Sequence, residues 1–149
     1  MRVASTIAAA ALAASGTVAA PGAPVTVLDA PEVRQAFSRG APLLETADYK
    51  VHASRREAPG KAEVHERDTD ILYVLEGEAT LVTGGAIVSG RLTAKEELRG
   101  DAILGGEPHA LVPGDVIVVP HGVPHQFTEV TAPFLYYVVK VPTGRGGAR

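Results

Sequence analysis

Short apolar runs, rather than a helical period, dominate the chain from residue 43 onward. They are rich in Val, Ile, Leu, Tyr and Thr and are separated by Gly and Pro, a pattern typical of β-strands. No stretch between them is long and periodic enough for a crossover helix, so the pattern predicts antiparallel sheets. Many short strands of this kind predict an all-β sandwich or barrel. The expected strands are 49–53, 62–65, 70–75, 79–83, 86–92, 109–112, 116–119, 125–130 and 134–141.

Two of these runs are apolar on both faces. Residues 70–75 and 116–119 show no alternation of apolar and polar positions. One face of each strand would fill the barrel, and the other face needs cover. We expect a second copy of the chain to supply it, which makes a homodimer.

A single helix is expected before the strands. Residues 29–32, Asp-Ala-Pro-Glu, form a helix-start signal, and Gly40 is placed to end the helix. Val33, Ala36 and Phe37 would lie on one face.

The first twenty residues have the pattern of a secretory signal. A basic start is followed by an Ala-rich apolar stretch over 7–14 and by small residues over 15–20. We therefore expect residues 1–20 to be removed and the protein to be periplasmic or secreted, with no stable membrane span after cleavage. The alternative is an uncleaved anchor, although Ser15-Gly16 interrupts a run already at the lower limit for spanning a bilayer.

The rest of the chain divides into three parts. Residues 21–42 would form a linker and an N-terminal arm with the helix, and residues 43–142 would form one β-barrel domain. The tail, 143–149, is rich in Gly and is expected to be disordered.

Charge and composition exclude some classes of function. The 14 Lys and Arg residues face 17 Asp and Glu residues, a formal net charge of -3, so we expect no nucleic-acid partner. The chain has no Cys, which excludes disulfides, thiolate metal sites and cysteine nucleophiles. Any metal ion must be held by His, Asp or Glu.

The segment before His125 carries the most specific motif. Pro120 and Gly122 form a turn between two strands, and His125 begins the returning strand. This spacing resembles the second motif of the cupin family, which reads Gly, five residues, Pro, one residue, Gly, two residues, His, three residues, Asn. Gly114, Pro120, Gly122 and His125 match it, and Glu129 stands at the Asn position.

The first motif of that family is present as a variant. The family has two His separated by one residue, then three or four residues, Glu, six residues and Gly. With Gly77 as the final Gly, the resemblance places Asp70 at the Glu position, His65 at the second His and Glu63 at the first His. It implies a metal set of Glu63, His65, Asp70 and His125. The shorter Asp70 would bind directly or through water, and Glu63 is open as a ligand, a catalytic base or neither.

Strand geometry supports this set independently. Glu63 and His65 are two residues apart and so share a strand face, and a turn at Asp68-Thr69 would bring Asp70 beside His65. An inward Asp70 in an apolar strand needs a metal ion or a cationic partner; the alternative is a turn residue at a solvated strand end. Two imidazoles with a carboxylate suit a divalent Fe, Mn, Ni or Zn ion, and the sequence does not choose among them.

Other polar residues have simpler interpretations. We do not expect the remaining histidines to be ligands: His52, His109 and His121. Three arginines are either surface charges or contacts for an anionic substrate at the barrel mouth: Arg55, Arg56 and Arg67. The tyrosines are expected to pack: Tyr49, Tyr73, Tyr136 and Tyr137.

The resemblance covers residues 49–141 and implies more about fold than about reaction. The implied fold is an antiparallel double-stranded β-helix, a jelly-roll β-barrel, with one short N-terminal helix. The leading hypothesis is an exported metal-binding protein that binds a small oxygen-bearing organic molecule in the barrel. If it is an enzyme, the expected activity is that of a metal-dependent dioxygenase, isomerase or epimerase in which Glu63 moves a proton. The alternative is a non-catalytic binding or sensing module. A barrel without metal is the third possibility, and it predicts that His65, His125 and Asp70 do not converge.

Overall fold

The computed structural model describes residues 22–94 and 96–143. The predicted export signal, residues 1–20, lies outside them, as does the predicted tail apart from Thr143. In chain order the elements are α1 (Ala30–Arg39), β1 (Ala41–Glu45), β2 (Lys50–Arg56), β3 (Ala62–His65), β4 (Asp68–Glu76), β5 (Ala79–Thr83), β6 (Ala86–Val88), β7 (Arg91–Ala94), β8 (Glu97–Gly100), β9 (Ala102–Leu104), β10 (Glu107–Leu111), β11 (Val116–Val119), β12 (His125–Val130) and β13 (Phe134–Pro142).

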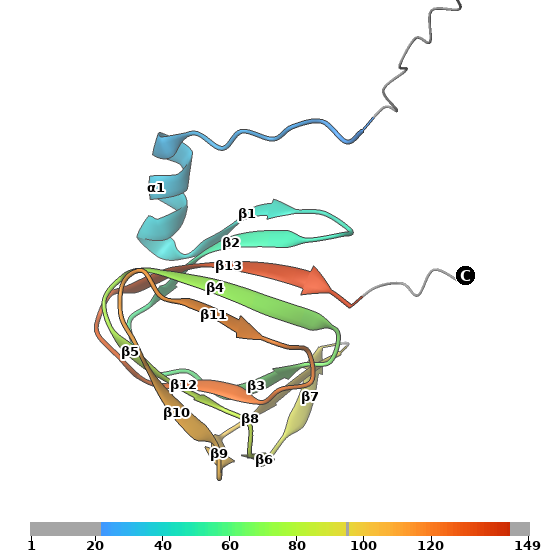
Figure 1. The fold of residues 1–149 in the computed structure, drawn as a ribbon, viewed down its shortest axis with the longest axis vertical. Helices are drawn as coiled ribbons and strands as arrows, with labels where there is room; N and C mark the ends of the chain where they lie inside the picture. The colour runs from blue at the N-terminus through green and yellow to red at the C-terminus, as the bar shows by residue number, and fades with distance from the viewer. Residues whose placement is uncertain (1–21, 95, 144–149) are drawn as a thin grey trace, which may run out of the picture.

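Two antiparallel sheets face each other across the molecule (Figure 1). One has five strands in the order β1-β2-β13-β4-β11, and the other has six in the order β10-β5-β12-β3-β8-β7. β6 and β9 form a separate two-stranded ribbon. The predicted fold class, an antiparallel jelly-roll barrel with one short N-terminal helix, is confirmed.

The core lies between the two sheets. Val74, Leu81 and Phe134 are its largest fully buried side chains. Phe134 stacks against Phe127 and Tyr136, with ring centroids 5.4 and 5.2 Å away. Because this cluster fills the barrel only in part, the remaining interior is free to form a cavity.

The helix begins and ends where the sequence predicts. The Asp29 side chain accepts a hydrogen bond of 2.8 Å from the backbone N–H of Glu32, and Gly40 follows the last helical residue. Phe37 packs edge-to-face on Tyr137 of β13, with ring centroids 4.9 Å apart. The helix thereby covers the outer face of the five-stranded sheet near β2 and β13. Among the described residues, no helix has the length and apolar character needed to cross a membrane.

Three details of the strand prediction are wrong. The expected strand 86–92 is two strands, β6 and β7, because the chain turns at Ser89, whose φ is +55°, and Gly90. The turn expected at Asp68-Thr69 lies at residues 66–67, and Asp68 and Thr69 already pair with β13. In addition, the sequence pattern did not predict three strands: β1, β8 and β9.

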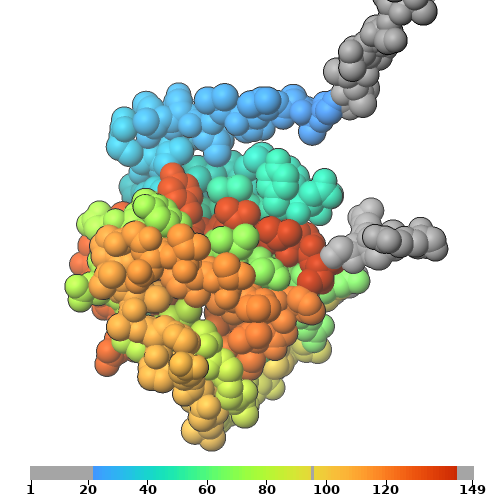
Figure 2. All heavy atoms as spheres, viewed as in Figure 1, coloured from blue at the N-terminus to red at the C-terminus, as the bar shows by residue number. Residues whose placement is uncertain are grey.

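The outer face of β4 and β11 is apolar and uncovered. Its side chains are exposed by 36% to 63%: Ile71, Tyr73, Leu75, Val116 and Val118. In the space-filling view the N-terminal arm, in blue, lies along the top of the molecule with the helix at the upper left, and neither covers the orange surface around β10 and β11 (Figure 2). The predicted homodimer stays a prediction, with this face as its candidate contact.

Candidate metal centre

Glu63 and His125 are brought together by strand pairing. Glu63 lies on β3, His125 begins β12, and the two residues are direct partners in the antiparallel register. Paired residues on antiparallel strands project to the same side, here into the barrel. The Glu63 Oε1 atom lies 3.5 Å from His125 Nε2, and His125 is buried.

His65 completes a group of three. It follows Glu63 by two residues on β3, and its ring centroid is 5.2 Å from that of His125. One donor atom from each of Glu63, His65 and His125 lies within 4.8 Å of the other two. Two imidazoles and a carboxylate so placed could hold a divalent metal ion. The two histidines converge, contrary to the barrel without metal, whereas Asp70 lies outside this group of three.

The turn that precedes β12 orients both histidines. The Val123 carbonyl lies 3.1 Å from His125 Nδ1, and a carbonyl can only accept, so a neutral His125 carries its proton there and leaves Nε2 free. The Gly122 N–H donates to the His65 carbonyl at 2.8 Å, which ties the turn to the end of β3. Gly122 has a φ of +76°, which favours glycine at this position.

Asp70 is held by a lysine rather than by the group of three. Asp70 on β4 pairs in register with Lys140 on β13. The Lys140 Nζ atom donates to both carboxylate oxygens of Asp70, at 2.9 and 2.8 Å. Lys140 is therefore the cationic partner that a buried Asp70 requires.

Lys140 also reaches His65. Its Nζ atom lies 2.9 Å from His65 Nε2, and Asp70 Oδ2 lies 3.3 Å from the same nitrogen. An ammonium group only donates, so His65 Nε2 accepts in this contact. A metal ion on this nitrogen would replace one of the three contacts of Lys140 and leave both bonds to Asp70.

Glu63 is ionised and fixed by its neighbours. Burial would raise the pKa of its carboxyl, but the hydrogen bond and charge that His125 supplies when protonated, with the charges of His65 and Arg99, lower that pKa to about 2. Arg99 is its partner on β8, with Nη2 3.4 Å from Glu63 Oε2. Burial likewise opposes ionisation of Asp70, yet His65 and Lys140 lower the pKa of Asp70 below its ordinary value. Glu63 can thus bind a cation without first losing a proton.

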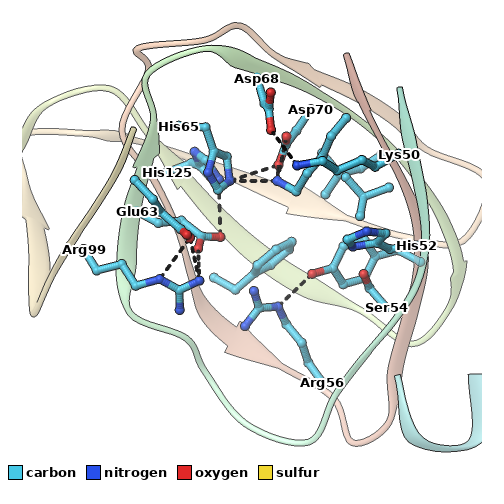
Figure 3. Close-up of a pocket in the computed structure, with 16 residues that line it drawn as sticks. Lys50, His52, Ser54, Arg56, Glu63, His65, Asp68, Asp70, Arg99 and His125 are labelled. Atoms are coloured by element: carbon cyan, nitrogen blue, oxygen red, sulfur yellow. Dashed lines mark hydrogen bonds and ion pairs between the residues drawn. The ribbon is translucent and has the colours of Figure 1, made fainter. Parts of the chain in front are cut away.

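The group of three faces a cavity of about 410 Å³. Figure 3 shows Glu63, His65 and His125 on one side of it and residues of β2 on the other. Leu72, Phe127 and Val138 line it with apolar surface. The opposite wall carries the alternate side chains of β2: Lys50, His52, Ser54 and Arg56.

Some cavity residues were not predicted to belong to the site. Tyr136, expected to pack, lines the cavity. Arg56 lines it too, and a contact with an anionic substrate was one of the two alternatives for this residue. Lys140 was not singled out, although a lysine inside the apolar run 134–141 was the available signal. His52 also lines the cavity, but its Nε2 atom contacts Glu45 at 3.0 Å.

The other two histidines lie elsewhere. His109 Nε2 is 2.9 Å from the Thr83 hydroxyl oxygen, and His121 is exposed. In the part of the chain that the structure describes, neither belongs to a metal-capable group.

Comparisons with known proteins agree with this architecture. A family model described as Cupin matches residues 49–143. KdgF from Halomonas sp. is 22% identical, with 70% of this chain and 80% of that chain covered and a TM-score of 0.51. A protein with a double-stranded β-helix domain from Klebsiella pneumoniae is also 22% identical, with coverages of 71% and 77% and a TM-score of 0.50.

A third similar structure is larger. The DMSP lyase DddQ from Ruegeria pomeroyi is 19% identical, with 74% of this chain but 48% of that chain covered and a TM-score of 0.50. At these identities the three structures support the fold alone. No curated protein sequence matches the chain.

Proposed function

The chain belongs to the cupin family, and on that premise we propose that it is a metal-dependent cupin acting on a small oxygen-bearing organic molecule. The observation that carries the proposal is the convergence of Glu63, His65 and His125 within 4.8 Å at the wall of a 410 Å³ cavity. The named lyase among the similar structures supports catalysis as one use of this fold.

The donor set suits a divalent Fe, Mn, Ni or Zn ion. All four accept two imidazoles and a carboxylate, and each leaves positions open for a ligand. A bound ion would supply Lewis-acid polarisation of a substrate oxygen.

Glu63 is better suited to binding the metal than to moving a proton. Its two oxygens face His125 and Arg99. We assign Glu63 as a ligand and Asp70, through Lys140, as a residue that positions His65.

Metal content tests this assignment. We expect the purified protein to hold one equivalent of a divalent ion, and Glu63→Gln, His65→Ala and His125→Ala each to weaken binding at least about tenfold, since each removes one of three donors. His121→Ala is the matched control, because His121 is exposed and outside the group. Elemental analysis gives the stoichiometry, and thermal unfolding in chelator shows whether each variant folds. A triad variant that keeps wild-type metal content would contradict the assignment.

One observation favours a second candidate, a binding module without turnover. Every carboxylate that lines the cavity has a Lys or Arg partner within 4.0 Å: Glu63, Asp68, Asp70 and Glu97. No acidic side chain of the described cavity wall is therefore free to act as a base. Recovery of a bound ligand unchanged after prolonged incubation with the metal-loaded protein would favour this candidate.

A further inference from the structure

The inner face of β2 is polar, which is unusual for a strand that lines a barrel. Lys50, His52, Ser54 and Arg56 alternate along it and all border the cavity. The opposite face carries Ala53, which is 1% exposed and packs in the cluster beneath α1. Ala53 thus faces the helix, whereas the site is faced by four polar side chains, which Figure 3 shows: Lys50, His52, Ser54 and Arg56.

Arg56 is the cation of this wall that lacks an acidic partner. Lys50 lies 3.8 Å from Asp68, and Arg99 contacts both Glu63 and Glu97. Among residues 22–94 and 96–143, no carboxylate lies within 4.0 Å of Arg56.

The charges that line the cavity also cancel. Four cationic side chains face four carboxylates there: Lys50, Arg56, Arg99 and Lys140, with Glu63, Asp68, Asp70 and Glu97. A divalent ion on the group of three would leave the cavity with a net positive charge. An anionic ligand complements that charge.

The guanidinium of Arg56 is held in a defined pose. Its Nε–H donates to the Tyr136 hydroxyl at 3.0 Å, and its Cζ lies 4.5 Å from the centre of the Phe127 ring. The two Nη groups make no hydrogen bond to a described residue. An arginine stacked on a ring with two free Nη groups is suited to bidentate binding of a carboxylate.

The guanidinium of Arg56 occupies space that is available because Gly60 has no side chain. A Cβ at Gly60 would lie 2.5 Å from Arg56 Nη1 and 3.3 Å from Cζ. The Gly60 N–H donates to the Phe127 carbonyl at 2.9 Å, and its own carbonyl accepts from Gln126 Nε2 at 3.0 Å. The backbone around Gly60 is therefore fixed against β12, and it encloses Arg56.

From these observations we propose that Arg56 binds the carboxylate of the ligand, so that the molecule taken into this cavity is a small organic acid. This inference rests on the proposed function, and it names the ligand class of the same site. Arg56 would hold the carboxylate with its two Nη groups. The second oxygen function of the acid would face Glu63, His65 and His125 across the cavity.

Calorimetric titration of the Zn²⁺-loaded full chain tests the proposal. The probes are lactate, pyruvate, malonate and succinate, each compared with its uncharged amide. We expect at least one acid to bind at least about tenfold more tightly than its amide, because only the acid offers a charged bidentate acceptor. Arg56→Gln should lower the affinity for that acid by at least about tenfold, and Arg56→Lys, which keeps the charge but loses the fork, by less.

Two further variants separate position from charge. Arg55→Gln is the matched control. Arg55 directly precedes Arg56 in the chain, but it pairs with Glu57 and does not line this cavity. It should bind the acid as the wild type does. Gly60→Ala should weaken acid binding by displacing the guanidinium, and should have no further effect in an Arg56→Gln background.

The results distinguish this inference from the proposed function. Binding of no acid, equal binding of acid and amide, or equal losses from Arg55→Gln and Arg56→Gln would overturn the role of Arg56. Metal content, measured on the same samples, should be unchanged in Arg56→Gln. A chain that binds acids through Arg56 but holds no metal would contradict the proposed function alone.

Discussion

At the scale of single residues, Lys140 distinguishes the two carboxylates that lie nearest the histidines. Its ammonium group donates to both oxygens of Asp70, whereas Glu63 keeps an oxygen directed at His125. Asp70 stands where the family motif has a Glu ligand, and Glu63 stands where it has a His. On the proposed assignment the two carboxylates exchange roles: Glu63 is the metal ligand, and Asp70 is the partner of a lysine.

Removing Lys140 should destabilise the protein strongly. Asp70 is 5% exposed, and Lys140→Met would leave its charge buried with only His65 beside it. We expect a loss of about 3 kcal/mol in the free energy of unfolding, measured by urea denaturation in chelator. The second variant, Lys140→Met with Asp70→Leu, should recover most of that loss because no buried charge remains.

Lys50→Met is the control for this prediction. Lys50 is the register partner of Lys140 on β2, but its side chain is 39% exposed and lies 3.8 Å from Asp68. We expect its loss to cost less than about 1 kcal/mol. Equal effects of the two Lys→Met variants would contradict the buried role of Lys140.

The sequence indicated the histidines of the site better than their partners. His125 followed from turn residues at fixed spacing, and His65 from a family motif with a strand-face argument. Lys140 lies 70 residues from Asp70, and Tyr136 lies 80 residues from Arg56. Such contacts depend on the register of strands that are distant in sequence, which a single sequence does not reveal.

At the scale of elements, the glycines of the two motifs are needed for the backbone conformation at turns and strand ends. Gly122 places its N–H on the His65 carbonyl, so the turn before β12 also fixes the end of β3. Gly77, at the end of β4, has a φ of +81°, and a Cβ there would lie 2.5 Å from Thr131 Oγ1. These glycines explain why the spacing predicts a fold more reliably than it predicts a reaction.

Strand prediction gave the correct bounds for four of the strands. β3, β5, β11 and β12 have the expected bounds. β8, Glu97–Gly100, was missed because two of its four residues are charged. β2 extends to Arg56, beyond the predicted end, because its inward face is polar and resembles a loop in sequence.

At the scale of the whole molecule, the outer face of β4 and β11 is an apolar surface that no other described element covers. β11 is an edge strand, and Val116 and Val118 are 63% and 57% exposed on it. Exposed apolar edges of this kind favour association. A second copy, related by a two-fold axis, would cover the same face on both chains.

The oligomeric state tests this surface. We expect sedimentation to show a dimer, and Val118→Lys to convert it to a monomer because the charge would be buried in the contact. Leu92→Lys is the control, since Leu92 is 69% exposed on β7 of the other sheet. A monomeric wild type, or a dimer that survives Val118→Lys, would contradict the assignment of this face.

The most direct test of the proposed metal site at Glu63, His65 and His125 is a crystal structure grown with Zn²⁺ and recorded at the zinc absorption edge. We expect an ion about 2.0 to 2.2 Å from one atom of each residue, with Lys140 still bonded to Asp70. An ion bound to Asp70 with Lys140 displaced, or one located away from the two histidines, would contradict it.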